Sequence, residues 1–234
     1  MRVLHIIATP RAQGSNTLRV SDAFLDGLRA RYTGVTVDVV DLYNYDLPAI
    51  AGTNIDVKYT LMMGRPIDKN HEESWRQIEL LIEHFIVSDV YLISSPMWNF
   101  SIPYALKYYI DCIIQPGYVF KYDEHGHPVP LVLGKRMVCV TSRGGDYGPT
   151  SVLQSYDFQE PYLRAIFGFV GIANIDFINA QPMDMSPALR EAAMAAAITQ
   201  ARSLATDTDW TAPGAVDAEE RPTELKPQPL QAYT

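Results

Sequence analysis

Three short segments of the sequence carry groups suited to binding a small ligand. The first, TPRAQGSNT (9–17), places hydroxyl and amide side chains directly before an amphipathic segment. At such a helix start, free N–H groups and a partial positive charge favour a phosphate, and the candidate contacts are Thr9, Ser15, Asn16 and Thr17. Because the segment is neither a Gly-x-Gly-x-x-Gly fingerprint nor a Walker sequence, it suits a small phosphate monoester better than a pyrophosphate or ATP. Taken alone, the same residues would serve equally well as a helix cap.

The second segment places large apolar side chains and one amide between a strand-like run and a helical one. Its residues are Pro96, Met97, Trp98, Asn99 and Phe100. They can pack around a planar ring while backbone amides reach the polar edge of that ring. The alternative is that they are core residues covering the end of a sheet.

The third segment, TSRGGDYG (141–148), follows another strand-like run. Gly144 and Gly145 let backbone N–H groups approach a ligand closely, as in anion-binding nests. Ser142 lies beside them, and Arg143 could add a positive charge or stack on a ring. An ordinary glycine turn is the alternative.

The elements that must position these segments alternate between β-rich and helical runs. Hydrophobic periodicity predicts strands over 2–8, 35–41, 89–95, 135–142 and 174–180, and helices over 15–32, 72–88, 103–114, 159–172 and 186–205. This alternation predicts an α/β fold with a five-stranded parallel sheet and helices on both faces. The flavodoxin-like, doubly wound order 2-1-3-4-5 fits five strands best, and it places ligands beyond the carboxyl ends of strands one and three. All three segments should therefore meet there around one ligand with a phosphate and a flat ring, as in flavin mononucleotide (FMN).

The domain organisation follows from the same pattern. We expect one domain over 1–205, with a hairpin-like excursion over 116–134. Residues 206–234 form a tail rich in proline and acidic groups. Its apolar anchors suggest that it lies along a surface, such as that of a second subunit; they are Trp210, Leu225, Leu230 and Tyr233.

Composition excludes several classes of function. The net charge of −8, with scattered Lys and Arg, argues against nucleic-acid binding. The sequence contains neither a membrane-length apolar run nor a signal-peptide pattern, so we expect a cytoplasmic protein that does not bind a membrane. Cys112 and Cys139 lack metal-ligand spacing, and His125 and His127 suit a solvated turn, so no metal is expected.

Several motifs resemble the FMN-dependent NAD(P)H:quinone oxidoreductases, also called azoreductases, of the flavodoxin-like superfamily. They are PMWNFSIPYALKYYID (96–111), GYVFKY (117–122), LVLGKR (131–136), TSRGGDYGP (141–149) and PYLRAIFGFVGI (161–172). The resemblance implies tightly bound FMN. Its phosphate would contact Thr9 and residues 15–17, and its ring system would lie between residues 97–100 and residues 142–145.

The same resemblance implies a homodimer with the flavin at the subunit interface. An aromatic residue of the partner walls the substrate pocket in this family, and Phe120 falls where that aromatic is expected. Phe167 is shifted by one position from the family pattern. The tail beyond residue 206 has no counterpart in the family.

The implied activity is hydride transfer from NAD(P)H to flavin N5, followed by reduction of a quinone or azo compound. Because one pocket would serve both the nicotinamide and the electron acceptor, the resemblance implies a two-electron ping-pong mechanism. The Gly144–Gly145 N–H groups would stabilise the reduced flavin. No side chain is assigned as a catalytic residue. Two alternatives stay open: a flavodoxin-type FMN electron carrier without substrate turnover, and a flavin-free phosphate-binding module on the same fold.

Overall fold

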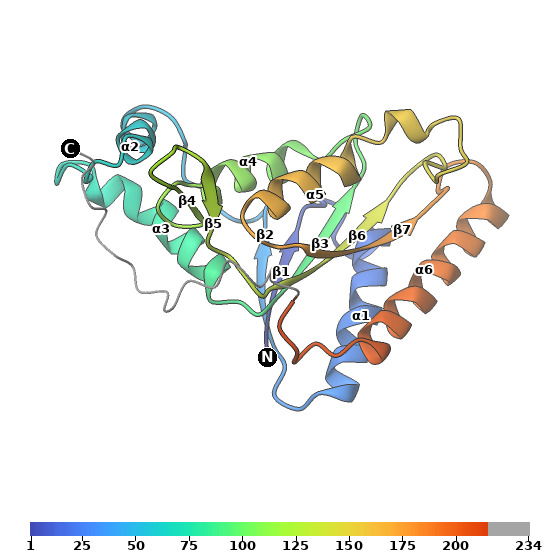
Figure 1. Cartoon of the computed structure of the whole chain (residues 1–234). Helices are drawn as coiled ribbons and strands as arrows, with labels where there is room; N and C mark the ends of the chain where they lie inside the picture. Colours follow the sequence, from blue (N-terminus) through green and yellow to red (C-terminus); the bar gives the residue numbers. More distant parts are fainter. Residues whose placement is uncertain (215–234) are drawn as a thin grey trace.

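A sheet of five parallel strands forms the centre of the molecule (Figure 1). The structure is a computed structural model and describes residues 1–214. The strand order is β2-β1-β3-β6-β7, which is the order 2-1-3-4-5 when only the strands of this sheet are numbered. The predicted doubly wound topology is therefore confirmed. The strands are β1 (Arg2–Ile7), β2 (Thr36–Asp41), β3 (Val90–Pro96), β6 (Arg136–Ser142) and β7 (Asn174–Ala180).

Helices cover both faces of this sheet, as the alternating pattern predicts (Figure 1). One face carries the first and last helices, and the other carries the middle ones. The first face has α1 (Asn16–Arg31) and α6 (Pro187–Asp207), whereas the second has α3 (Glu72–Ile86), α4 (Tyr104–Ile113) and α5 (Gln159–Phe169). Two short 3₁₀ helices, η1 (Ala12–Gly14) and η2 (Gln154–Tyr156), lie in loops.

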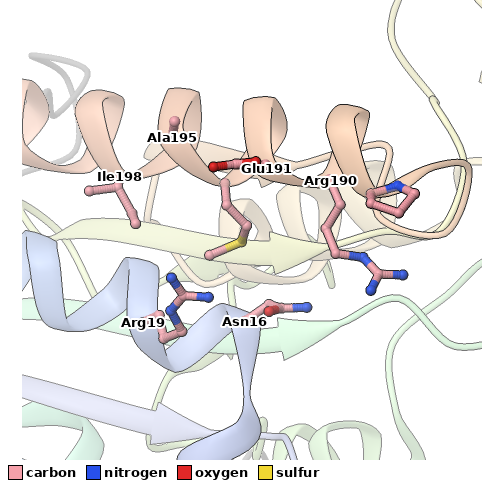
Figure 2. A pocket seen from close by; sticks show the side chains of 8 residues that line it. Asn16, Arg19, Arg190, Glu191, Ala195 and Ile198 are labelled. Atoms are coloured by element: carbon pink, nitrogen blue, oxygen red, sulfur yellow. The ribbon is translucent and has the colours of Figure 1, made fainter.

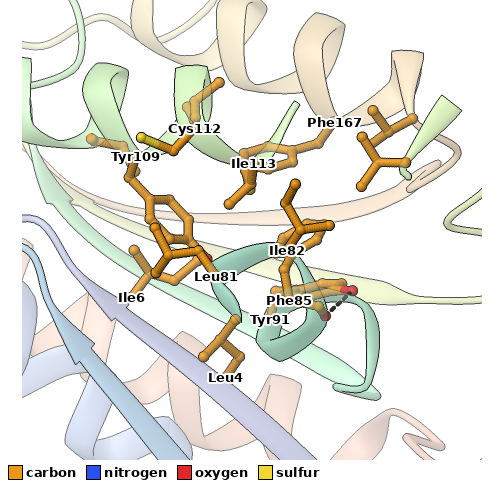
Figure 3. Packing of buried hydrophobic residues seen from close by; sticks show 14 of the residues in the cluster. Leu4, Ile6, Leu81, Ile82, Phe85, Tyr91, Tyr109, Cys112, Ile113 and Phe167 are labelled. Atoms are coloured by element: carbon orange, nitrogen blue, oxygen red, sulfur yellow. Dashed lines mark hydrogen bonds between the residues drawn. The ribbon is translucent and has the colours of Figure 1, made fainter. Parts of the chain in front are cut away.

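Each face of the sheet buries its own apolar cluster because side chains alternate along a strand. In β1, Val3 faces α1 and α6, whereas Ile6 faces α3 and α4. Figure 3 shows the second cluster, where the ring of Phe85 stacks on Tyr91 at a centroid distance of 4.3 Å. The Tyr91 hydroxyl donates to the carbonyl of Phe85 at 2.9 Å, and the ring of Phe167 lies 6.2 Å from that of Phe85, nearly parallel to it. Phe167 is thus a core residue.

A sixth α-helix lies where the sequence pattern indicates only a loop. The segment 51–71 contains α2 (Thr53–Met62), which packs against α3. Val57 and Leu61, one turn apart, are its buried apolar residues. The helix begins at Gly52 without a side-chain cap, so the usual start signal is missing.

The excursion before β6 forms a small antiparallel pair, β4 (Phe120–Tyr122) and β5 (Pro128–Pro130). Beyond α6, past the expected domain boundary at 205, the chain packs first against α1 and then, at residues 212–214, against the segment 134–136. Trp210 is buried, its ring lies 5.2 Å from that of Phe24, and its indole N–H donates to the carbonyl of Leu204 at 3.2 Å. The other three expected tail anchors lie outside the described residues. No helix among residues 1–214 is long and apolar enough to span a membrane.

Candidate functional site

A pocket of about 180 Å³ lies where the three predicted segments meet, beyond the carboxyl ends of β1, β3 and β6. The predicted residues that line it are Thr9, Ser15, Asn16, Pro96, Met97, Trp98, Ser142, Arg143 and Gly144. The other lining residues are Arg11, Met183 and Asp184, which the sequence pattern did not indicate. A complete small-molecule site usually measures about 300–1,000 Å³, so this pocket encloses only part of a nucleotide-sized ligand.

The start of α1 forms one end of the pocket and has the properties of an anion site. Ser15 caps the helix, because its hydroxyl accepts the N–H of Leu18 at 3.3 Å. The N–H groups of Asn16 and Thr17 have no hydrogen-bond partner within residues 1–214. Arg11 adds a positive charge at the same end. Such a set of donors suits a phosphate.

Thr17 contributes to this end differently from what the sequence suggests. Its side chain is buried and does not line the pocket. Its hydroxyl lies 2.8 Å from the hydroxyl of Ser15 and so holds the capping residue in place. The backbone N–H of Thr17 has no hydrogen-bond partner among the described residues, whereas its hydroxyl is used in this contact.

The loop after β3 contains a tight turn, which connects the strand to α4 although its side chains are large. Trp98 and Ser101 exchange two backbone hydrogen bonds, at 2.9 and 3.0 Å, around a two-residue turn. Asn99 and Phe100 occupy its centre with positive φ angles of 48° and 71°. Asparagine tolerates this conformation, but phenylalanine is strained in it by about 1–3 kcal/mol. The turn leaves Trp98 and Phe100 about two-fifths exposed beside the pocket.

Gly144 lies opposite, in the loop after β6. Its carbonyl accepts the N–H groups of Met183 and Asp184 at 3.1 and 3.0 Å. A Cβ atom at Gly144 would lie 2.6 Å from the Oδ2 atom of Asp184, so a larger residue here would displace the exposed Asp184 side chain. The Gly144 N–H has no partner in the part of the chain that the structure describes. Gly145 does not line the pocket, and its Cβ would instead meet Leu153 at 2.8 Å.

The side chain of Arg143 is turned into the protein rather than toward a ligand. It is 1% exposed, and its Nη1 atom donates to the Oδ2 atom of Asp157 at 2.8 Å. Its Nε atom donates to the Oε1 atom of Gln159 at 3.2 Å, and Glu160 lies 3.8 Å from Nη2. The expectation that the guanidinium stacks on a ring or adds charge to the site is therefore wrong. Because the side chain is buried, only the main chain of Arg143 is available to the pocket.

A buried polar chain lies beneath the pocket between the sheet and α1. The Nε2 atom of His5 is 2.7 Å from the Ser94 hydroxyl, which is 2.6 Å from the hydroxyl of Ser21. Burial, with a smaller effect of Arg29, lowers the pKa of His5 to about 4. His5 is thus a neutral, packed residue and not a general base.

Aromatic side chains cluster around Trp98, which lines the pocket, and around Phe100 in the adjoining turn. Phe100 lies 5.2 Å from Tyr156, ring to ring, on one side. On the other, Tyr43 contacts both Trp98 and Tyr104, at 6.3 and 5.8 Å. These aromatic rings form a rim that a flat ligand or a second protein surface could cover.

Phe120, expected to wall a partner's substrate pocket, lies away from this rim. Its side chain is 6% exposed and packs against Phe169 and Tyr122 at ring distances of 4.8 and 5.6 Å. Phe169 is 37% exposed and presents the aromatic surface at this place. No trio of His, Cys, Asp or Glu side chains with the geometry of a metal site occurs in residues 1–214.

Comparisons with known proteins agree with this geometry. A family profile described as "Flavodoxin-like fold" matches residues 1–205. The FMN-dependent NADH:quinone oxidoreductase of Nitratidesulfovibrio vulgaris (strain DP4) is 37% identical over 204 residues, which cover 87% of this chain and 97% of that protein. FMN-dependent NADH:quinone oxidoreductase 2 of Pseudomonas syringae pv. tomato is 36% identical over 88% of this chain and 98% of its own.

Among solved structures, the FMN complex of an FMN-dependent NADH-azoreductase from Bacillus anthracis is similar, with a TM-score of 0.78. It is 25% identical, and the match covers 88% of this chain and 98% of that chain. The profile match agrees with the observed strand order, and the relatives are covered over nearly their whole length. The chain therefore belongs to the flavodoxin-like fold family, as an oxidoreductase related to the FMN-dependent NADH:quinone oxidoreductases and the azoreductases.

Proposed function

We propose that this protein binds FMN in the pocket and uses it to transfer two electrons from NADH or NADPH to quinones or azo compounds by a ping-pong mechanism. The observation that carries the proposal is the polarity of the site. Unpaired helix N–H groups and Arg11 lie at one end, and the exposed face of Trp98 lies at the other, with exposed Phe100 two residues further along the chain. A phosphate and a flat ring are the two ends of FMN. Relatives named as FMN-dependent oxidoreductases support the choice of this cofactor.

The residues present fit the phosphate of FMN. The N–H groups of Asn16 and Thr17 would donate to its oxygens, and the guanidinium of Arg11 would supply a charge-assisted hydrogen bond. The hydroxyls of Thr9 and Ser15 line the same end. These donors at the start of α1 can bind one phosphate, which is the number that FMN carries.

The residues also fit the ring system. Met97 and Trp98 offer apolar surface, while the unpaired N–H groups of Asn99 and Gly144 can donate to the carbonyls at its polar edge. When bound, FMN supplies the hydride-accepting and electron-donating chemistry. The protein orients the ring, and the Gly144 N–H places a partial positive charge where negative charge develops on reduction. Glycine at 145 and the buried ion pair of Arg143 hold this loop.

We further propose a homodimer of cytoplasmic subunits in which the aromatic rim is covered by the partner. Tyr104, Tyr156 and Phe158 are 70%, 49% and 57% exposed. The ring of Tyr156 packs against Phe100, and the N–H of Phe158 donates to the carbonyl of Phe100. Tyr104 is joined to Trp98 through the ring of Tyr43. Clustered exposed aromatic side chains mark interaction surfaces. A partner subunit would also enclose the ring that the pocket leaves open.

The first experiment is anaerobic addition of NADH, and separately NADPH, to the purified protein, followed by a quinone. We expect a yellow protein that bleaches in one two-electron step and recovers its colour with the quinone. Arg11→Ala should weaken FMN binding about tenfold, because a charge-assisted hydrogen bond is lost. A protein that takes up no FMN would disprove the proposal. A flavoprotein that neither nicotinamide reduces would be an electron carrier instead.

A further inference from the structure

A second hollow, the α1–α6 groove, opens between α1 and α6 and shares Asn16 with the pocket (Figure 2). Its volume of about 410 Å³ lies in the range of small-molecule sites, about 300–1,000 Å³. It is lined by Asn16 and Arg19 of α1 and by Pro187, Arg190, Glu191, Met194, Ala195 and Ile198 of α6.

The groove lies toward the N-terminal ends of the two helices. Near their C-terminal ends they pack closely: a Cβ atom on Gly27 would lie 2.7 Å from the Cβ atom of Ala205. Toward the carboxyl ends of the strands they diverge (Figure 1). Asn16 and Arg19 are neighbours on the α1 surface, three residues apart, and face the opening.

The walls of the groove combine an apolar floor with a cationic rim. Met194 is buried and, together with Ile198, lines the groove with apolar surface. Arg19 is exposed and makes no ion pair or hydrogen bond with any described residue through its side chain. Such a surface suits a flat apolar ring with a phosphate beside it.

Arg190 connects the groove with the pocket. Its Nε atom donates to the carbonyl of Met183 at 2.6 Å, and its Nη2 atom lies 3.5 Å from Asp184, two residues that line the pocket. Its Nη1 atom has no partner among the described residues, and Arg190 lines the groove. Asn16 lines both hollows, so a phosphate bound at its free N–H would lie between them.

We propose that the α1–α6 groove is an adenylate subsite, so that this protein binds flavin adenine dinucleotide (FAD) as well as FMN. The inference rests on the proposed flavin site, because the phosphate at Asn16 is the point from which the adenylate extends. The second phosphate of FAD would reach Arg19 and Arg190. The adenine would lie on Met194 and Ile198, and Glu191 offers acceptors to the ribose hydroxyls or the adenine amino group.

The test measures FMN and FAD affinities of the flavin-free protein by isothermal titration calorimetry. Ala195→Trp fills the groove from an exposed position, so it should leave the fold and the FMN affinity unchanged. We expect the FAD affinity of Ala195→Trp to be about a hundredfold lower than that of the wild type, because the indole ring would occupy the space of the adenylate. Ala196→Trp, exposed on the neighbouring position outside the groove, is the matched control and should bind both flavins normally.

A second pair of variants tests the cationic rim. Arg19→Ala should weaken FAD binding about tenfold and leave FMN binding unchanged, since one charge-assisted contact to the second phosphate is lost. Arg29→Ala, on the same helix but outside the groove, should change neither affinity. Equal FAD affinity in the wild type and Ala195→Trp would overturn the inference.

Two further outcomes separate the possible failures. If the wild type binds FMN but not FAD, the adenylate subsite is overturned and the proposed function stands. If the wild type binds neither flavin, the proposed function itself is overturned. The adenylate of NAD(P)H is the other possible occupant. A raised KM for NADH in FMN-loaded Ala195→Trp, with FAD affinity unchanged, would assign the groove to the nicotinamide dinucleotide and overturn the flavin assignment.

Discussion

Acidification should destabilise this protein through one buried histidine, His5. In the folded state the imidazole is 4% exposed, bonded to Ser94, and its pKa is about 4, whereas the ordinary value is 6.5. Between these two values the unfolded chain binds a proton that the folded chain does not. The free energy of unfolding therefore decreases as the pH falls below about 6.5, and the loss from this group is complete only below about 4.

The size of the effect follows from the two pKa values. The full difference between 6.5 and about 4 corresponds to about 3.4 kcal/mol. At pH 5 the unfolded imidazole is almost fully protonated and the folded one mostly neutral, so about 2 kcal/mol is lost relative to pH 8. That amount is a large fraction of the stability of a typical domain, about 5–15 kcal/mol.

Urea unfolding of flavin-free protein at pH 8 and pH 5, at equal protein concentration, measures the loss. Carboxylates also titrate in this interval, so the decisive comparison is with His5→Gln, which keeps a hydrogen-bonding amide but cannot titrate. We expect the wild type to lose about 2 kcal/mol more than His5→Gln between the two pH values. Equal losses in both proteins, or an NMR titration of His5 with a midpoint above 6, would refute the reasoning.

Three other substitutions probe the loops of the site. Arg143→Met should lower the free energy of unfolding by about 3–5 kcal/mol in urea denaturation, because it leaves the carboxylate of Asp157 without its buried partner. Gly144→Val should reduce FMN affinity in calorimetry with little change in stability, because the new side chain displaces the exposed Asp184 side chain and obstructs the pocket wall. Phe100→Asn should raise the free energy of unfolding by about 1 kcal/mol in urea, because asparagine tolerates a φ of 71°.

Each of these variants has a matched control or a decisive contrary result. Gly14→Ala is the control for Gly144→Val, since a Cβ at Gly14 meets no atom within 4 Å, and it should bind FMN normally. Lys107→Met removes an exposed ion pair with Asp111 and should cost less than about 1 kcal/mol, in contrast to Arg143→Met. A Phe100→Asn protein less stable than the wild type would show that the ring contacts outweigh the backbone strain.

The sheet was predictable from sequence because its strands are short apolar runs bounded by helical periodicity. Each predicted strand matches the observed one to within one residue at either end, for example 174–180 for β7. The helix α2 was not predictable, because it starts without a side-chain cap and its buried apolar residues are few. Tertiary packing against α3, which no local pattern encodes, decides its conformation.

For the candidate site, the sequence predicts the residues that directly follow a strand of the sheet, but not those that reach the pocket through tertiary contacts. Topology brings the ends of β1, β3 and β6 together, so most of the lining residues followed from their place after a strand. Asp184 reaches the pocket from the loop before α6, which depends on how closely that loop approaches Gly144. The direction of the Arg143 side chain depends on partners 14 and 16 residues away along the chain.

The ion pair between Arg143 and Asp157 also bears on how fast a ligand can bind. It joins the loop after β6 to the segment before α5 at 2.8 Å, with Gln159 as a second anchor. A loop already fixed in its binding conformation loses little conformational entropy when a ligand arrives, so the association rate is not limited by loop ordering. Weakening this anchor should therefore slow association more than a change at the exposed rim, because the ligand would have to wait for the loop to reform.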